Sequence, residues 1–275
     1  MNDQLGFQPN TLQTVISIKE RPPRLAAIST VLAFSWRALL KIKHVPEQLF
    51  DVTASPVIFL LMFTYLFGGA LAGSTGEYLQ FVLPGILVMT VSLITIYTGL
   101  GINQDIKKGV FDRFRSLPIW RPAVIVGALL ADAARYTMAS MVMILLGVVL
   151  GYRPEAGLPG VLLAVGLLLI FCSCLSWIWI ALGLVMRTPE SLMGVTMMIL
   201  FPLTFASNVF VSPQTMPGWL EAFVNVNPIT HLVTAVRGLM SGQADAGETI
   251  LVLAVSLGLL AVFGPLAIKA YRRKQ

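Results

Sequence analysis

The chain has 275 residues, of which 56% are hydrophobic and 12% are charged, and its mean hydropathy is +0.82. Soluble domains carry roughly 25% charged residues, so this composition excludes an ordinary soluble enzyme, a disordered regulator and a nucleic-acid-binding domain. The net charge is +6 and the pI is about 9.5, which a membrane protein explains by placing its basic residues on one side. We therefore expect an all-α integral membrane protein.

Residues 1–48 are predicted to form a cytoplasmic segment that contains an amphipathic helix at about residues 24–45. Its large apolar side chains recur at spacings of three and four, and its cations share another face. The apolar set is Leu25, Ile28, Leu32, Trp36, Leu39 and Leu40, and the polar set is Arg37, Lys41 and His44. Such a helix should lie along the membrane interface. It is either a simple anchor or a connecting helix that also contacts a cytoplasmic partner.

Residues 49–275 are predicted to form the transmembrane domain, because six apolar runs approach or exceed the roughly 20 residues that a spanning helix needs. They cover about residues 52–72, 81–103, 122–150, 158–186, 192–211 and 249–270. With six spans, nearly all of the 19 Lys and Arg residues fall on one side. The positive-inside rule then predicts that both termini are cytoplasmic. No signal peptide is expected, and the expected location is the plasma membrane.

One acid and one base lie within the third run. Asp132 and Arg135 are three residues apart, so they share a helix face and can form an ion pair. Ionisable groups at membrane depth are rare and often functional. The pair is either a self-neutralised structural element or part of a gating or interhelix contact.

The loop between the second and third runs, residues 103–122, is predicted to contain a short amphipathic helix that Pro118 ends. Apolar and charged residues alternate along it. The apolar members are Ile106, Val110, Phe111 and Phe114, and the charged members are Lys107, Asp112, Arg113 and Arg115. Exposed aromatics beside cations suit docking into a groove of another protein. The alternative is a basic loop that only determines topology.

The stretch at residues 201–239 stays apolar but is interrupted by Pro213, Pro217, Gly218 and Pro228. These residues divide it into pieces too short to span, so it should form a hairpin of helices that dips into the outer leaflet. Its polar residues either cap the helix pieces, which we favour, or supply polar contacts at membrane depth. They are Asn208, Asn225, Asn227 and His231.

Motifs for chemistry are absent from the sequence. It has no phosphate-binding GxxxxGK[ST] loop, no HExxH and no zinc-ligand cluster, and it contains only two histidines. Cys172 and Cys174 are two residues apart, which is not the spacing of a CxxC pair. We therefore expect no catalytic residues, no metal and no cofactor bound by the chain itself, so any energy it uses must come from elsewhere.

Four segments carry a resemblance to a known family: residues 44–71, 109–118 (GVFDRFRSLP), 187–211 and 216–239 (MPGWLEAFVNVNPITHLVTAVRGL). The chain resembles the permease subunits of type-2 ATP-binding-cassette (ABC-2) exporters, and among them the daunorubicin-resistance permeases. The resemblance implies six spans with a connecting helix, a coupling helix and an outer re-entrant hairpin. It also implies a pair of permeases working with two copies of a separate P-loop ATPase, which binds ATP and Mg.

The implied function is export of a hydrophobic small molecule such as an anthracycline. The main ATPase contact is expected at Lys107, Gly109, Val110, Phe111, Asp112, Arg113, Phe114, Arg115 and Pro118, and a second one at Trp36 and Arg37. The substrate path is expected along the interface of a homodimer, and its residues are Phe59, Phe63, Tyr97, Met193, Met197, Met198 and Asn208. The alternatives are an exporter of a lipid or lipid-linked glycan and, more distantly, a stand-alone channel.

Overall fold

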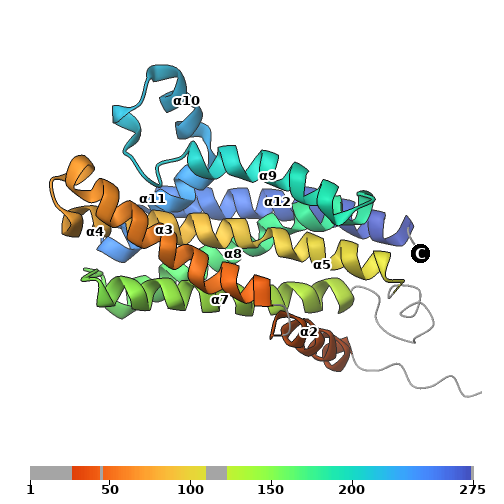
Figure 1. Ribbon diagram of the computed structural model, residues 1–275. Helices are drawn as coiled ribbons and strands as arrows, with labels where there is room; N and C mark the ends of the chain where they lie inside the picture. The colour runs from red at the N-terminus through yellow and green to blue at the C-terminus, as the bar shows by residue number, and fades with distance from the viewer. Residues whose placement is uncertain (1–26, 44–45, 110–122, 274–275) are drawn as a thin grey trace, which may run out of the picture.

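The computed structural model describes residues 27–43, 46–109 and 123–273, and all regular structure in these ranges is helical. Most of the helices run lengthwise beside one another as a bundle (Figure 1). The bounds are α2 (Ala27–Lys43), α3 (Pro46–Ala72), α4 (Thr75–Ile94), α5 (Ile96–Lys107), α7 (Ala123–Val149), α8 (Gly157–Val185), α9 (Pro189–Phe205), the 3₁₀ helix η1 (Pro213–Thr215), α10 (Gly218–Val226), α11 (Pro228–Ser241) and α12 (Ala246–Arg273).

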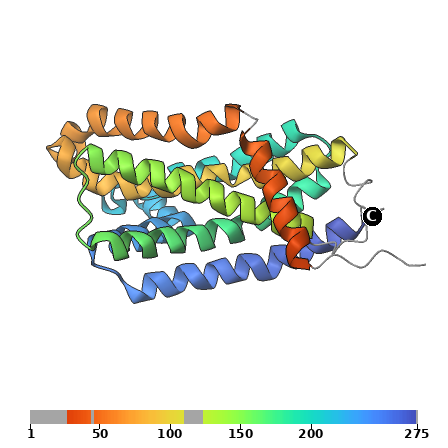
Figure 2. The same cartoon turned by 90° about the horizontal axis from the view of Figure 1, so that it is seen from below.

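The two ends of the bundle are easily told apart. We call the end where α12 finishes the inner end, and the opposite end, where α3 meets α4, the outer end (Figure 1). At the inner end α2 crosses α7 obliquely instead of joining the bundle lengthwise (Figure 2). This crossing agrees with the separate amphipathic helix expected at about residues 24–45.

Five helical segments in the described part of the chain are long and apolar enough to cross a membrane. They are Ala54–Leu71, Thr75–Lys107, Ala123–Val149, Gly157–Val185 and Ala246–Arg273. The run expected at residues 192–211 is instead the 17-residue helix α9, which ends at Phe205. The extension to residue 211 was wrong because residues 206–212 turn away from the helix axis, and Ala206 already has a non-helical ψ of 59°.

The second segment, α4 with α5, is the most buried part of the bundle. In its most apolar window, 83% of the residues are buried, against 22% for the windows in α3 and α12. Leu83, Ile86 and Leu87 of α4 are fully buried, as are Phe171 and Trp179 of α8. The outer surfaces of α3 and α12 remain apolar and exposed, which suits contact with lipid or with another membrane helix.

The second segment is not one continuous helix, because Thr95 interrupts it. Ile94, Thr95 and Ile96 are consecutive β-branched residues, which have reduced helix propensity. The Thr95 hydroxyl donates a 2.6 Å hydrogen bond to the Ser92 carbonyl and accepts a 2.8 Å bond from Trp179 Nε1. A side chain that bonds a carbonyl one turn back competes with the helical hydrogen bonds. The break is therefore stabilised by a specific contact with α8.

Two glycines bring α5 and α8 together on the inner side of this break. A Cβ atom on Gly99 would lie 2.4 Å from the Trp179 carbonyl oxygen, and one on Gly183 would lie 2.6 Å from the Gly99 carbonyl oxygen. Close approach of backbones at small residues is a common way for membrane helices to associate. The Asn103 amide extends this contact by donating hydrogen bonds to the carbonyls of Gly183 and Met186.

The proline-rich stretch forms the expected hairpin of short helices, η1, α10 and α11, near the outer end (Figure 1). Asn227 lies at its base and is only 3% exposed. Its Oδ1 caps α11 by accepting a 2.9 Å hydrogen bond from the Ile229 N–H. Its Nδ2 donates 2.7 Å bonds to the carbonyls of Leu203 and Ala206, at the end of α9. Asn227 therefore caps a helix, as expected, and also joins two helix ends.

Candidate functional site: a charged cluster between α2, α5 and α7

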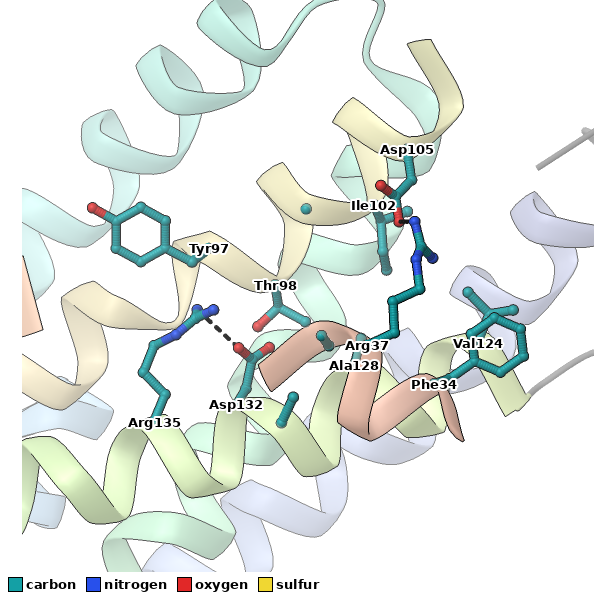
Figure 3. Close-up of a pocket in the computed structure, with 13 residues that line it drawn as sticks. Phe34, Arg37, Tyr97, Thr98, Ile102, Asp105, Val124, Ala128, Asp132 and Arg135 are labelled. Carbon is teal, nitrogen blue, oxygen red and sulfur yellow. Dashed lines mark ion pairs between the residues drawn. The ribbon is translucent and has the colours of Figure 1, made fainter. Parts of the chain in front are cut away.

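A half-open cavity of about 80 Å³ lies near the inner end of the bundle, where α2, α5 and α7 meet. Figure 3 shows its charged side chains: Arg37 comes from α2, Asp105 from α5, and Asp132 and Arg135 from α7. The cavity has room for several water molecules, since one water needs about 10–15 Å³ of such volume. We call these four residues the inner charged cluster.

Asp132 and Arg135 form the deeper of its two ion pairs. Asp132 Oδ1 lies 2.8 Å from Arg135 Nη1, and the two residues are only 3% and 7% exposed. The i,i+3 pairing expected from their spacing is therefore present. The guanidinium also lies over the Tyr97 ring of α5, 5.4 Å from its centroid. Nε of Arg135 makes no hydrogen bond.

Arg37 and Asp105 form the shallower pair, which joins α2 to α5. Arg37 Nη2 lies 3.4 Å from Asp105 Oδ2, with side chains 44% and 17% exposed (Figure 3). An ion pair this exposed contributes at most about 1 kcal/mol, so its main effect is to orient α2. Arg37 remains exposed in this pair, so the expected contact of Arg37 with another protein stays a prediction.

A chain of polar side chains continues from this cluster into the bundle. The Tyr136 hydroxyl of α7 lies 2.8 Å from Ser176 Oγ of α8 and 3.4 Å from Thr98 Oγ1 of α5. Thr98 also contacts Asp132 (Figure 3). Tyr136 and Ser176 are fully buried. Polar contacts at this depth hold three helices in one relative arrangement, because an unpaired polar group would be costly there.

The crossing of α2 over α7 is close because α7 has a glycine there. A Cβ atom on Gly127 would lie 2.6 Å from the Phe34 Cβ atom. With this face against α7, the stripe of Leu32, Trp36 and Leu40 is exposed, and Trp36 is 65% exposed. These three members of the expected apolar stripe therefore point away from the bundle, where they can enter lipid or contact another protein.

Most of the expected coupling helix lies outside the described residues. Val110, Phe111, Asp112, Arg113, Phe114, Arg115 and Pro118 belong to this undescribed part. At its near edge, Lys107 Nζ lies 3.9 Å from Glu190 Oε2, which links α5 to the start of α9. Gly109 follows with a positive φ of 65°, a backbone conformation that favours glycine. The chain thus turns sharply where the coupling segment begins.

Comparison with known proteins decides the family. Residues 29–241 match the family described as ABC-2 type transporter. The chain is 52% identical to the daunorubicin resistance ABC transporter permease protein DrrB1 of Streptomyces coeruleorubidus, over 96% of this chain and 93% of the relative. This chain belongs to the ABC-2 transporter family. It is also 23% identical to the doxorubicin resistance ABC transporter permease protein DrrB of Mycobacterium tuberculosis (strain ATCC 25618 / H37Rv), over 74% of this chain and 71% of the relative.

Membership of the ABC-2 family confirms the resemblance seen in the sequence and makes the chain a multi-pass membrane permease. No three His, Cys, Asp or Glu side chains in the described ranges gather closely enough to hold a metal ion. The cytoplasmic position of both termini, the number of six spans and the copy number of the assembly stay predictions.

The side chains expected along the ABC-2 substrate path do not gather at one place within a single chain. Phe59 and Phe63 stack on α3, and Phe63 also stacks on Phe210, with ring centroids 4.2 Å apart. Tyr97 belongs to the inner cavity, whereas Asn208 lines a second cavity at the outer end. On α9, Met193 and Met198 are 46% and 80% exposed, and Met197 packs against the buried Leu192 cluster.

Two contacts of this ABC-2 chain were missed from the sequence. The pairing of Arg37 with Asp105 was not expected, because Asp105 lies beyond the expected run at residues 81–103, where water can solvate a carboxylate. The buried group of Thr98, Tyr136 and Ser176 was also missed. It has only a weak signal, since hydroxyl side chains are common in membrane helices and usually bond their own backbone.

Proposed function

We propose that this chain is the non-catalytic membrane subunit of an ATP-driven exporter that moves a hydrophobic, anthracycline-like drug out of the cell. The observation that carries the proposal is the 52% identity, over nearly the full length, to a permease named for daunorubicin resistance. A second relative, named for doxorubicin resistance, supports the same substrate class. In this proposal the chain binds no cofactor, and a separate P-loop ATPase binds ATP and Mg.

The proposed topology has six spans in the plasma membrane, with both termini in the cytoplasm. Five long apolar helices support it, and α9 is proposed as a short further span that continues into the outer hairpin. The basic residues Lys107, Arg187 and Arg272 occur where helices end or begin at the inner end, which agrees with a cytoplasmic inner face.

The proposed assembly contains two copies of this chain and two copies of the ATPase. The main contact with the ATPase is proposed at residues 107–118, where Phe111 and Phe114 fill a groove and the neighbouring charges form polar pairs. A second contact is proposed at α2 through the exposed Trp36. Hydrophobic substrate is proposed to pass between the two copies, along α3, α5 and α9, with the exposed methionines of α9 as an adaptable wall.

The inner charged cluster suggests how a movement of the ATPase would be transmitted to the helices of the bundle. A displacement of α2 would act on α7 through the close crossing at Gly127 and on α5 through the Arg37–Asp105 pair. A displacement of the coupling loop would pull on the end of α5 directly. Both routes meet at Asp132 and Arg135, which lie between α5 and α7. The cluster is therefore proposed to keep α2, α5 and α7 moving together.

The test replaces Phe111 and Phe114 by Ala in the complex with its ATPase. We expect the double variant to fold and reach the membrane but to lose co-purification with the ATPase or to hydrolyse ATP without exporting drug. The control replaces Leu158 and Leu162, two exposed apolar residues in the first turns of α8, by Ala and should leave export unchanged. Unchanged export by the double variant would refute the coupling assignment.

The alternatives make different predictions in the same preparation. ATP hydrolysis stimulated by lipid-linked sugar but not by lipophilic drugs would favour a lipid or glycan exporter. Solute movement by the purified chain alone, without ATP, would favour a channel.

A further inference from the structure

A second cavity, of about 290 Å³, lies near the outer end beneath the hairpin. It is larger than the inner cavity and approaches the lower limit of ordinary ligand pockets. Its wall comes from α4, the 206–212 connection, η1, α10, α11 and α12. We call it the outer pocket.

The lining of the outer pocket is strongly polar for a membrane protein. Asn208, Gln214, Asn225 and Thr230 supply amide and hydroxyl groups, and Arg237 adds a guanidinium group. Asn208 and Thr230 are each only 5% exposed, and Asn208 Oδ1 and Thr230 Oγ1 have no hydrogen-bond partner. Buried polar atoms without partners are rare and costly in a native protein, so a ligand or ordered water that reached them from the pocket would be stabilised.

Charges in the outer pocket are balanced. Arg237 donates hydrogen bonds to the carbonyls of Phe81 and Asn208, and it lies 4.0 Å from the centroid of the Phe81 ring. Burial lowers the pKa of Arg237 to about 10, so it stays protonated at neutral pH. On the opposite wall Glu248 Oε2 lies 2.9 Å from His231 Nδ1. One cation and one carboxylate in the same lining favour neither an anion nor a cation as the ligand.

The available hydrogen-bonding groups are of both kinds. The amide side chains of Gln214 and Asn225 are exposed in the lining, and each presents a donor and an acceptor. A phosphate or carboxylate would satisfy only donors, and an ammonium would satisfy only acceptors. A hydroxylated group satisfies both, because each hydroxyl donates one hydrogen bond and accepts others.

Helix α10 provides an apolar surface next to the outer pocket. Trp219, Phe223 and Val226 lie on one face of the helix at spacings of four and three, and they are 75%, 46% and 80% exposed. Asn225 of the same helix lines the pocket. A tryptophan on such a face is typical of the membrane interface, which would bring the pocket to the level of the head groups.

We propose that the outer pocket binds the hydroxylated, uncharged head of an amphipathic molecule in the adjoining leaflet, whose apolar part lies along Trp219 and Phe223. The site shares only Asn208 with the proposed substrate path, and it stands whether or not the chain exports drugs.

The test measures protection of a thiol in the outer pocket. The variant Gln214→Cys places a thiol in the wall, and Thr215→Cys places one on the next residue, which is exposed but does not line the pocket. The complete chain is reconstituted in phospholipid nanodiscs, and alkylation at each position is followed by mass spectrometry of peptides, which separates it from the native Cys172 and Cys174. Three probes with the same tail are compared below their micelle-forming concentrations: octyl glucoside, octyl phosphate and octylammonium.

We expect octyl glucoside to slow alkylation of Gln214→Cys roughly fivefold at about four times its Kd, as competition for one site requires. The two charged probes and the Thr215→Cys control should show no such effect. Adding Asn225→Leu, a change at an exposed position, should weaken the protection. Protection by octyl phosphate alone, protection by octylammonium alone, equal slowing at both cysteines, or no protection by any probe would each overturn the proposal.

Discussion

Replacing Asp132 by Leu tests whether the inner charged cluster stabilises the bundle through charge balance. The variant leaves Arg135, which is 7% exposed, without its carboxylate 2.8 Å away. Breaking one partner of a buried pair costs about 3–5 kcal/mol, because the remaining charge is uncompensated. Replacing both residues, as Asp132→Leu with Arg135→Met, removes the charges together and should restore stability to within about 1 kcal/mol of the original chain.

The assay is thermal unfolding of the purified variants in mixed detergent micelles, and the melting temperature of each variant is measured. At roughly 2–4 °C per kcal/mol for a chain of this size, the single variant should melt about 6–20 °C lower. The control Ala134→Leu changes an exposed position between the two residues, on another face of the same helix, and should melt normally. A single variant as stable as the double variant would refute the charge-balance argument. If the double variant is stable but fails to export, the pair also has a role in transport.

Two further predictions concern the contact between α5 and α8. Gly99→Ala should destabilise the chain by about 1–3 kcal/mol, because its Cβ atom would meet the Trp179 carbonyl. Gly101→Ala is the control, since its Cβ atom would have no atom within 4 Å and should cost little stability. Thermal melting compares the two variants. Thr95→Val should lower the free energy of unfolding by about 1–3 kcal/mol, because it leaves Trp179 Nε1 unpaired. Thr137→Val is the control and should cost little, since the Thr137 hydroxyl bonds only its own helix. Equal losses of stability in denaturant unfolding would contradict this prediction.

Much of the helical layout could be predicted because long apolar runs and prolines have direct physical consequences. The runs require helices in a membrane, and the prolines of the 201–239 stretch require interruptions. The ion pair of Asp132 and Arg135 followed from helix geometry alone, since three residues make less than one turn. The end of α9 was less predictable, because apolar residues continue after Phe205, at Ala206, Val209, Phe210 and Val211.

The contacts of α2 show what periodicity cannot predict. The spacing of Leu32, Trp36 and Leu40 indicated correctly that they share a face, but it could not indicate whether that face meets the bundle or the surroundings. The position of Arg37 depends on Asp105, which is distant in sequence and becomes a neighbour only through the fold. The break at Thr95 could have been anticipated from its β-branched neighbours, but its bond to Trp179 could not.

The hydrogen bonds of Asn227 have a consequence for the depth at which α9 can end. With 17 residues and a rise of 1.5 Å per residue, α9 is only about 26 Å long, shorter than a hydrocarbon core of about 30 Å. A helix that stops inside lipid leaves its last carbonyls without water. The Asn227 amide supplies donors to two of these carbonyls, at Leu203 and Ala206. One asparagine therefore allows a helix to finish below the membrane surface without leaving these two carbonyls unpaired.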